Sequence, residues 1–261
     1  MKLLGRTQPL AHLPIEQALQ RLHRVGFDGV EICLEPEGMQ PDQLTPQKIT
    51  AVREQVRTLG LHPVSVSYHV DYVYDDYLFQ LSQEAIRLTP EFGTNLFVFS
   101  GPPQRTGTRE EWREMVQRTK VLARLAEVYR VVLAEEFEPG FVVGSTAATL
   151  RLMQEVASPA LMVNLDLGHV FLCDPDPLAA IYRIGHFAVH CHIENMAAGV
   201  HDHLLPQEGD IDLLKYLEAL DDVGYDGPLS LDLYKYDYEA VAPAAIACLR
   251  GWLNQIESRR T

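Results

Sequence analysis

The sequence predicts a (β/α)8 barrel, the TIM-barrel fold, formed by one domain over residues 1–261. Its 261 residues are 47% hydrophobic, which is enough to bury the core of one such domain. Eight short β-branched runs alternate with eight helix-length amphipathic segments, a pattern typical of parallel βα units. Thr7-Gln8-Pro9 follows the first run, where an open doubly wound sheet usually has a glycine-rich phosphate turn.

The predicted elements follow one another without a linker or a break in composition. The strands are expected at 2–6, 29–34, 63–68, 95–100, 131–137, 161–167, 188–193 and 228–233. The helices are expected near 14–25, 46–59, 75–88, 108–129, 145–156, 177–184, 211–223 and 238–257. Capping residues before three of the helices support these starts, namely Thr45, Thr108 and Asp176. Gly26 and Gly224 occupy matching positions in two similar segments, and each is expected to end a helix.

Composition excludes several classes of protein. The formal net charge is −14 and no run of lysine or arginine is present, so nucleic-acid binding is not expected. No apolar stretch resembles a signal peptide or a membrane span, which predicts a cytoplasmic protein without a membrane partner. The four cysteines form no C-x-x-C pair and are expected to be free thiols.

Polar residues collect where the later predicted strands end. The positions are Glu135 and Glu136 in the fifth strand, Asp166 in the sixth, His190 and His192 in the seventh, and Asp232 in the eighth. Barrel enzymes place their catalytic groups at these C-terminal ends. Carboxylates and neutral imidazole together suit a divalent ion such as Mn²⁺, Mg²⁺, Co²⁺ or Zn²⁺.

Strand periodicity indicates which of these side chains face the barrel interior. Because side chains alternate along a strand, Glu136 shares the inner face with Ala134, whereas Glu135 points toward the helices or the next layer. His190 and His192 share one face, and only one of them needs to be a metal ligand. The sequence alone does not decide between them.

Four segments resemble one known family. They are Phe27-Asp28-Gly29-Val30-Glu31, Glu136-Phe137, Asp166-x-x-His169 and His190-x-His192. They are similar to motifs of the xylose isomerase-like barrel superfamily, which includes sugar epimerases, inosose-converting enzymes, hydroxypyruvate isomerases and endonuclease IV. The likeness spans nearly the whole chain.

The resemblance implies one divalent metal ion, Mn, Co, Mg or Zn, as the cofactor. Its ligands would be Glu136, Asp166, His192 and Asp232. The last of these departs from the family pattern, because relatives have a glutamate that is longer by one methylene at this point. Asp237, a few residues later, is the weaker substitute for the same role.

The resemblance also implies proton transfer next to the carbonyl of a small sugar, ketose or cyclitol, through a metal-stabilised enediolate. Glu136 and Asp232 would exchange the proton, and His169 would orient a substrate hydroxyl as the third catalytic residue. Further substrate contacts would come from Glu31, His69 and Glu138. An unphosphorylated substrate is expected, because the strand-end loops offer few cations.

A histidine-rich loop follows the seventh predicted strand. In endonuclease IV a D-x-H segment of this loop, with the D-x-x-H histidine, binds a further zinc ion. The resemblance therefore implies a second metal site at His169, His201 and His203. Ser100 stands where endonuclease IV has a strand-four histidine, so a complete three-metal cluster is not expected.

Three functions are compatible with these features. The first is a metal-dependent sugar isomerase or epimerase, expected as a homodimer or homotetramer like many relatives. The second is a hydrolase or lyase of the endonuclease IV type with two or three metal ions. The third is a barrel without catalytic activity that serves a biosynthetic cluster as a binding subunit, an alternative that the short Asp232 keeps open.

Overall fold

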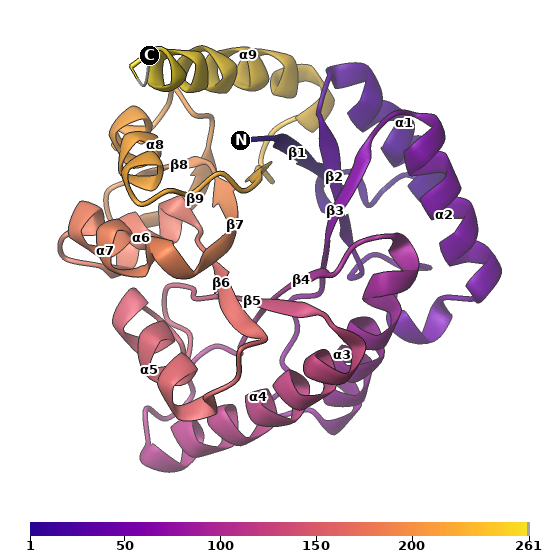
Figure 1. The fold of residues 1–261 in the computed structure, drawn as a ribbon, viewed down its shortest axis with the longest axis vertical. Helices are drawn as coiled ribbons and strands as arrows, with labels where there is room; N and C mark the ends of the chain where they lie inside the picture. Colours follow the sequence, from indigo (N-terminus) through magenta and orange to yellow (C-terminus); the bar gives the residue numbers. More distant parts are fainter. Residues whose placement is uncertain (260–261) are drawn as a thin grey trace.

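The computed structural model describes residues 1–259 and contains a closed, parallel, eight-stranded barrel (Figure 1). Its strands are β1 (Leu3–Arg6), β2 (Gly29–Cys33), β3 (His62–Ser67), β4 (Leu96–Ser100), β5 (Val132–Glu136), β6 (Leu161–Asn164), β7 (Ala188–Ile193) and β10 (Leu229–Leu231). They pair in chain order, and β10 closes the barrel by pairing with both β7 and β1. The predicted (β/α)8 barrel is confirmed.

Helices between the strands form the outer ring that Figure 1 shows. They are α1 (Ile15–Val25), α2 (Pro46–Thr58), α3 (Asp76–Leu88), α4 (Arg109–Tyr129), α5 (Thr146–Val156), α7 (Pro177–Ile184), α8 (Leu213–Asp222) and α9 (Tyr238–Glu257). Thr45, Thr108 and Asp176 each accept a hydrogen bond from a backbone N–H of the first turn, as predicted. Within residues 1–259, no helix has both the length and the apolar character needed to cross a bilayer.

Glycines end two of these helices as the sequence predicts. Gly26 after α1 has a φ of +94°, and Gly224 after α8 has a φ of +80°. This left-handed backbone is unfavourable for residues with a Cβ. The two similar segments therefore make the same kind of turn into β2 and β10.

Two additions to the barrel were not predicted from sequence. The sixth strand was expected to reach residue 167, but β6 ends at Asn164 and the short helix α6 (Leu167–Cys173) follows it. Asp166 caps α6 by accepting a hydrogen bond from His169 N, which explains why the extended run stops there. A hairpin of β8 (Asn195–Ala197) and β9 (Val200–Leu204) follows β7, and it packs against α6.

Apolar side chains fill the barrel beneath its C-terminal end. Leu96, Val98 and Ala134 form a buried cluster, against which Val132 and Val189 pack. Ala134 and Glu136 are two residues apart in β5, so Glu136 lies above this cluster on the inner face, as predicted. The polar residues at the C-terminal end of the barrel therefore lie above an apolar layer of its interior.

Candidate functional site

The four residues predicted to hold a metal ion lie together at the C-terminal end of the barrel. Glu136 ends β5 and His192 lies in β7, and Glu136 Oε2 is 3.0 Å from His192 Nδ1. Asp166 follows β6 and Asp232 follows β10, and their Oδ2 atoms lie 3.9 and 3.8 Å from His192 Nδ1. The tertiary structure therefore brings the whole predicted set to one place.

Two atoms of this set make no hydrogen bond within residues 1–259. They are His192 Nδ1 and Asp166 Oδ2, and both side chains are fully buried. Buried polar atoms nearly always have a partner, and these two ligand-type atoms, 3.9 Å apart, fit a cation between them. Ligand atoms of Glu136, Asp166 and His192 all lie within 4.8 Å of one another. Carboxylates with one imidazole fit a divalent metal ion here.

Neighbouring groups fix the orientation of His192. Its Nε2 lies 3.1 Å from Glu31 Oε2, which leaves Nδ1 for the carboxylates. His190 instead bonds through Nδ1 to Asn164 Oδ1 at 2.8 Å, and burial lowers the pKa of His190 to about 3. Asn164 Nδ2 also donates to Glu136 Oε2 at 2.6 Å. Of the two histidines that share a face, His192 therefore lies with the carboxylates and His190 supports them.

Arg6 is a buried cation in this cluster that sequence reasoning missed. It ends β1 and is 2% exposed, and its guanidinium forms ion pairs with Asp232 and with Glu31. The Glu31 pair measures 2.9 Å from Nε to Oε1, and Nη1 also donates to the Tyr234 hydroxyl. In the sequence, its position at the end of the first predicted strand was the one feature that could have indicated a place in the site.

The charges shift the pKa values of Glu136, His192 and Asp232. Burial alone would raise the pKa of Glu136, but His192 holds it well below its usual range. Burial alone would lower the pKa of His192, but Glu136 and then Glu31 hold it well above. Arg6 likewise overcomes burial and lowers the pKa of Asp232. Glu136 and Asp232 are therefore ionised at neutral pH, as a metal ligand or a general base must be.

A cavity of about 170 Å³ borders the cluster at the mouth of the barrel. It is lined by Arg6, Gln8, His69, Glu136, Glu138, His169, His201, His203, Asp232 and Tyr234. His69, Glu138 and His169 therefore lie where the predicted substrate contacts need them. Glu31 does not line the cavity, because its side chain is fully buried between Arg6 and His192.

Two lining residues have unusual pKa values. Burial lowers the pKa of His69 to about 4, and its Nδ1 lies 3.1 Å from Ser100 Oγ. Burial and then the neighbouring carboxylate of Glu136 raise the pKa of Glu138 to about 7. His69 is therefore neutral at physiological pH, whereas Glu138 titrates there.

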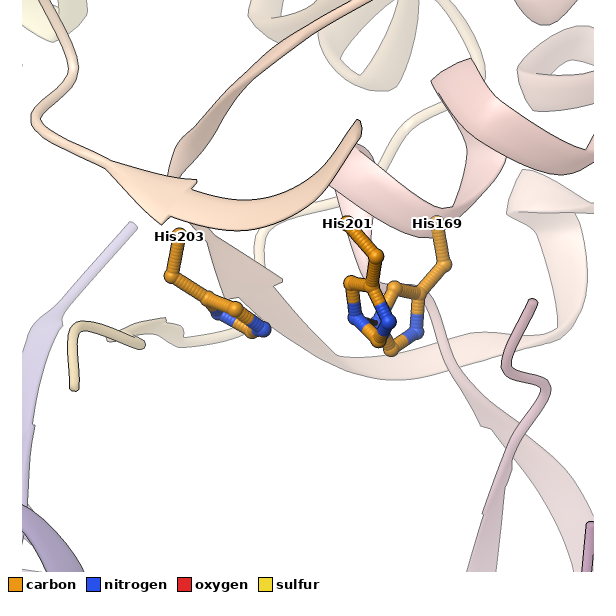
Figure 2. Close-up of side chains that lie close together, drawn as sticks. All are labelled: His169, His201 and His203. Carbon is orange, nitrogen blue, oxygen red and sulfur yellow. Dashed lines mark hydrogen bonds between the residues drawn. The ribbon is translucent and has the colours of Figure 1, made fainter. Parts of the chain in front are cut away.

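Three histidines gather at the edge of the cavity (Figure 2). His169 comes from α6, and His201 and His203 come from β9. His169 Nδ1 lies 2.9 Å from the carbonyl oxygen of Phe137, so its Nε2 faces His201 Nε2, also at 2.9 Å. Two nitrogens on one tetrahedral zinc lie about 3.4 Å apart, given Zn–N bonds near 2.1 Å. The three histidines of the predicted second set lie together. His169 and His201 are in direct hydrogen-bonding contact, closer than two ligands of one zinc ion.

Glu194 is a further buried carboxylate that was not chosen from sequence. It follows β7, two residues beyond His192, and Gly168 N donates to its Oε1 at 2.9 Å. A Cβ at position 168 would collide with this carboxylate, so the close approach requires glycine. Burial and then Asp166 raise the pKa of Glu194 well above its usual range. The alternation that placed His190 and His192 on the inner face also predicts Glu194 there.

Glu35→Gln is expected to stabilise the metal-free protein at alkaline pH. Glu35 Oε1 accepts from His69 N at 2.7 Å, a bond that glutamine can keep. Burial raises the pKa of Glu35 to about 7, from about 4.3 in an unfolded chain. Its ionisation therefore costs folding free energy progressively as the pH rises between these values. The substitution should add about 1–3 kcal/mol above pH 7.

Thermal unfolding of both proteins with a chelator, near pH 4.5 and pH 8.5, tests this prediction. The gain should be small at the acidic pH and full at the alkaline pH. An equal gain at both would contradict the pKa assigned to Glu35.

Comparison with known proteins identifies the family. A family model described as xylose isomerase-like TIM barrel matches residues 19–252. A 3-dehydroshikimate dehydratase of Bacillus anthracis is 23% identical over 195 residues, which cover 71% of this chain and 68% of that protein. A fructoselysine 3-epimerase of Escherichia coli O157:H7 is 23% identical over 236 residues, which cover 85% and 86%.

A solved structure shares the fold over almost its full length. The crystal structure of the IOLI protein with a zinc atom has a TM-score of 0.78 and 20% identity, with 99% of each chain covered. The family model covers most of the present chain and includes every residue of the cluster except Arg6. The chain therefore belongs to the xylose isomerase-like TIM barrel family.

Proposed function

We propose that this protein is a metal-dependent isomerase or epimerase of a small sugar, ketose or cyclitol. One observation carries the proposal: Glu136 and Asp232 both line the cavity and both approach His192 Nδ1, at 3.0 and 3.8 Å. Two ionised carboxylates thus border both the metal set and the space for a substrate. The fructoselysine 3-epimerase relative supports a sugar as the substrate class.

The chain's own residues have separate tasks in this reaction. A bound divalent ion, held by Glu136, Asp166, His192 and Asp232, would supply Lewis-acid polarisation of the substrate carbonyl. Glu136 would remove the proton from the carbon next to that carbonyl and later release it to water. Asp232, held in place by Arg6, would pass a proton taken up from water to that carbon. Because Phe137 engages Nδ1 of His169, this residue would orient a hydroxyl through Nε2, in exchange for the contact of Nε2 with His201.

The charges of the cavity favour an uncharged substrate. Arg6 is the sole lysine or arginine among the lining residues of the described chain, and two carboxylates already engage it. Arg105, a cation in the loop between β4 and α4, instead pairs with Asp71 at 2.6 Å. Glu136, Glu138 and Asp232 would repel a phosphate or a carboxylate group. We therefore propose an unphosphorylated polyol ketone.

The protein as purified is expected to contain Mn, Co, Mg or Zn, and chelation should abolish its activity until one of these ions is restored. Elemental analysis measures the metal. A screen of ketoses and inososes in D2O, followed by NMR, should show deuterium entering the carbon next to the carbonyl. Deuterium exchange without metal, or no effect of chelators, would overturn the proposal. Loss of water from the substrate would indicate dehydratase chemistry instead.

A second candidate function rests on the three-histidine cluster. If His169, His201 and His203 hold a metal ion as well, a hydrolase or lyase with more than one ion becomes the better proposal. Metal stoichiometry of wild type and of His201→Asn separates the two functions. The non-catalytic alternative depends on Asp232, and it would gain only if Asp232→Glu created an activity that the native chain lacks.

A further inference from the structure

Glu194 lies beside the proposed metal set, and the chemistry proposed above does not use it. Its side chain is fully buried, Gly168 N holds Oε1, and Oε2 makes no hydrogen bond within the part of the chain that the structure describes. Asp166 is held in the same way, with Oδ1 accepting from His169 N at 2.7 Å and Oδ2 unpartnered. The first turn of α6 thus fixes two neighbouring carboxylates and leaves one oxygen of each free.

His203 and Asp232 lie next to the Glu194 carboxylate. Ligand atoms of Glu194, His203 and Asp232 all lie within 4.8 Å of one another. Asp232 Oδ2 is 3.5 Å from His203 Nδ1 and 3.8 Å from His192 Nδ1. His203 Nδ1 also lies 3.0 Å from the carbonyl oxygen of Asp232, a contact that a bound cation would replace. Asp232 Oδ2 therefore lies between two sets of ligand atoms, while Arg6 binds Oδ1 of the same carboxylate.

The balance of charge favours a cation in this second set. Five buried carboxylates form or border the proposed metal set within residues 1–259: Glu31, Glu136, Asp166, Glu194 and Asp232. Arg6 is the one lysine or arginine that forms an ion pair with any of them in the described chain. Arg6 and a single divalent ion carry three positive charges, which leaves one negative charge uncompensated even if Glu194 stays protonated. A second divalent ion would bring the positive charge to five, so that Glu194 could bind it as a carboxylate.

We propose that Glu194, Asp232 and His203 bind a second divalent cation beside the ion assigned to Glu136, Asp166 and His192. The inference rests on the proposed function, because the two ions share the Asp232 carboxylate. A carboxylate-rich set with one imidazole suits Mn²⁺ or Co²⁺. Paired ions of this kind lie about 3.5–4 Å apart and hold two oxygens of one substrate. A polyol ketone offers several oxygens to such a pair of ions.

Equilibrium dialysis of full-length protein against Mn²⁺ tests the proposal, with EPR as the spectroscopic readout. Wild type is expected to bind two ions per chain and to show the broadened spectrum of two coupled ions. Glu194→Gln keeps the acceptor for Gly168 N and should bind one ion, with the six-line spectrum of an isolated Mn²⁺. If Glu194→Gln does not fold, His203→Asn tests the same site by removing its imidazole ligand.

His201→Asn is the matched control, because it alters the three-histidine cluster and leaves the Glu194 set intact. It should still bind two ions. A single ion in wild type, or two in both Glu194→Gln and His203→Asn, overturns this second site while the first remains. Loss of the second ion in His201→Asn but not in Glu194→Gln assigns it to the histidines and also overturns the proposal. No bound ion in any protein overturns the first site as well.

Discussion

Glu136→Gln is expected to lower kcat/KM by roughly 10³-fold or more, once the substrate is known, because one carboxylate serves two purposes. The side chain is placed to bind the metal ion and to remove the substrate proton, and an amide does neither well. The substitution should also weaken metal binding, since Glu136 Oε2 faces His192 Nδ1 at 3.0 Å. Steady-state kinetics and calorimetric titration with Mn²⁺ measure the two effects.

Glu135→Gln is the matched control for this prediction. Glu135 precedes Glu136 in the same strand, is also buried, and faces the helices. There burial and then Glu135 raise the pKa of Tyr72, which contacts Thr119 of α4. Burial raises the pKa of Glu135 well above its usual range, so the folded protein holds it protonated and an amide replaces it closely. Activity within about twofold of wild type is expected. A Glu136→Gln enzyme as active as this control would exclude Glu136 from the chemistry.

Arg6→Met is expected to destabilise the metal-free protein by roughly 3–5 kcal/mol, because it leaves two buried carboxylates without their cation. Asp232 and Glu31 lie at opposite sides of one guanidinium, and both are at most 2% exposed. For a protein of this size the loss corresponds to a fall in Tm of roughly 6–20 °C. Thermal unfolding with a chelator present measures it without a contribution from bound metal.

Two further variants separate the buried ion pairs from other effects of Arg6. The double variant Arg6→Met with Asp232→Asn removes one of the two carboxylate charges that lose their cation, so it should recover part of the lost stability. Arg250→Met breaks the exposed pair with Asp28, also 2.9 Å long, and should cost less than about 1 kcal/mol. Equal losses from Arg6→Met and Arg250→Met would show that the buried network contributes little.

Local sequence patterns predicted much of the candidate site because strand alternation and strand ends follow from short-range geometry. The alternation of side chains along β5 distinguished Glu136, on the inner face, from Glu135. The same alternation placed His190 and His192 on one face of β7. The sixth strand was predicted to reach residue 167 because residues 161–167 form a mostly apolar run. The strand ends earlier because Asp166, within that run, caps α6. The hairpin after β7 was missed because Asn195–Ala197 is too short to show a pattern.

The sequence by itself determined the alternating strands and helices, the family motifs and the carboxylates and histidines at the strand ends. Each of these depends on residues that are close together in the chain. The tertiary structure decided that Arg6 neutralises Asp232, a residue 226 positions away, because closure of the barrel places β1 beside β10. It also placed Glu194 against α6 and beside Asp232 and His203. Such contacts join separate strands and loops, so no local pattern in the sequence contains them.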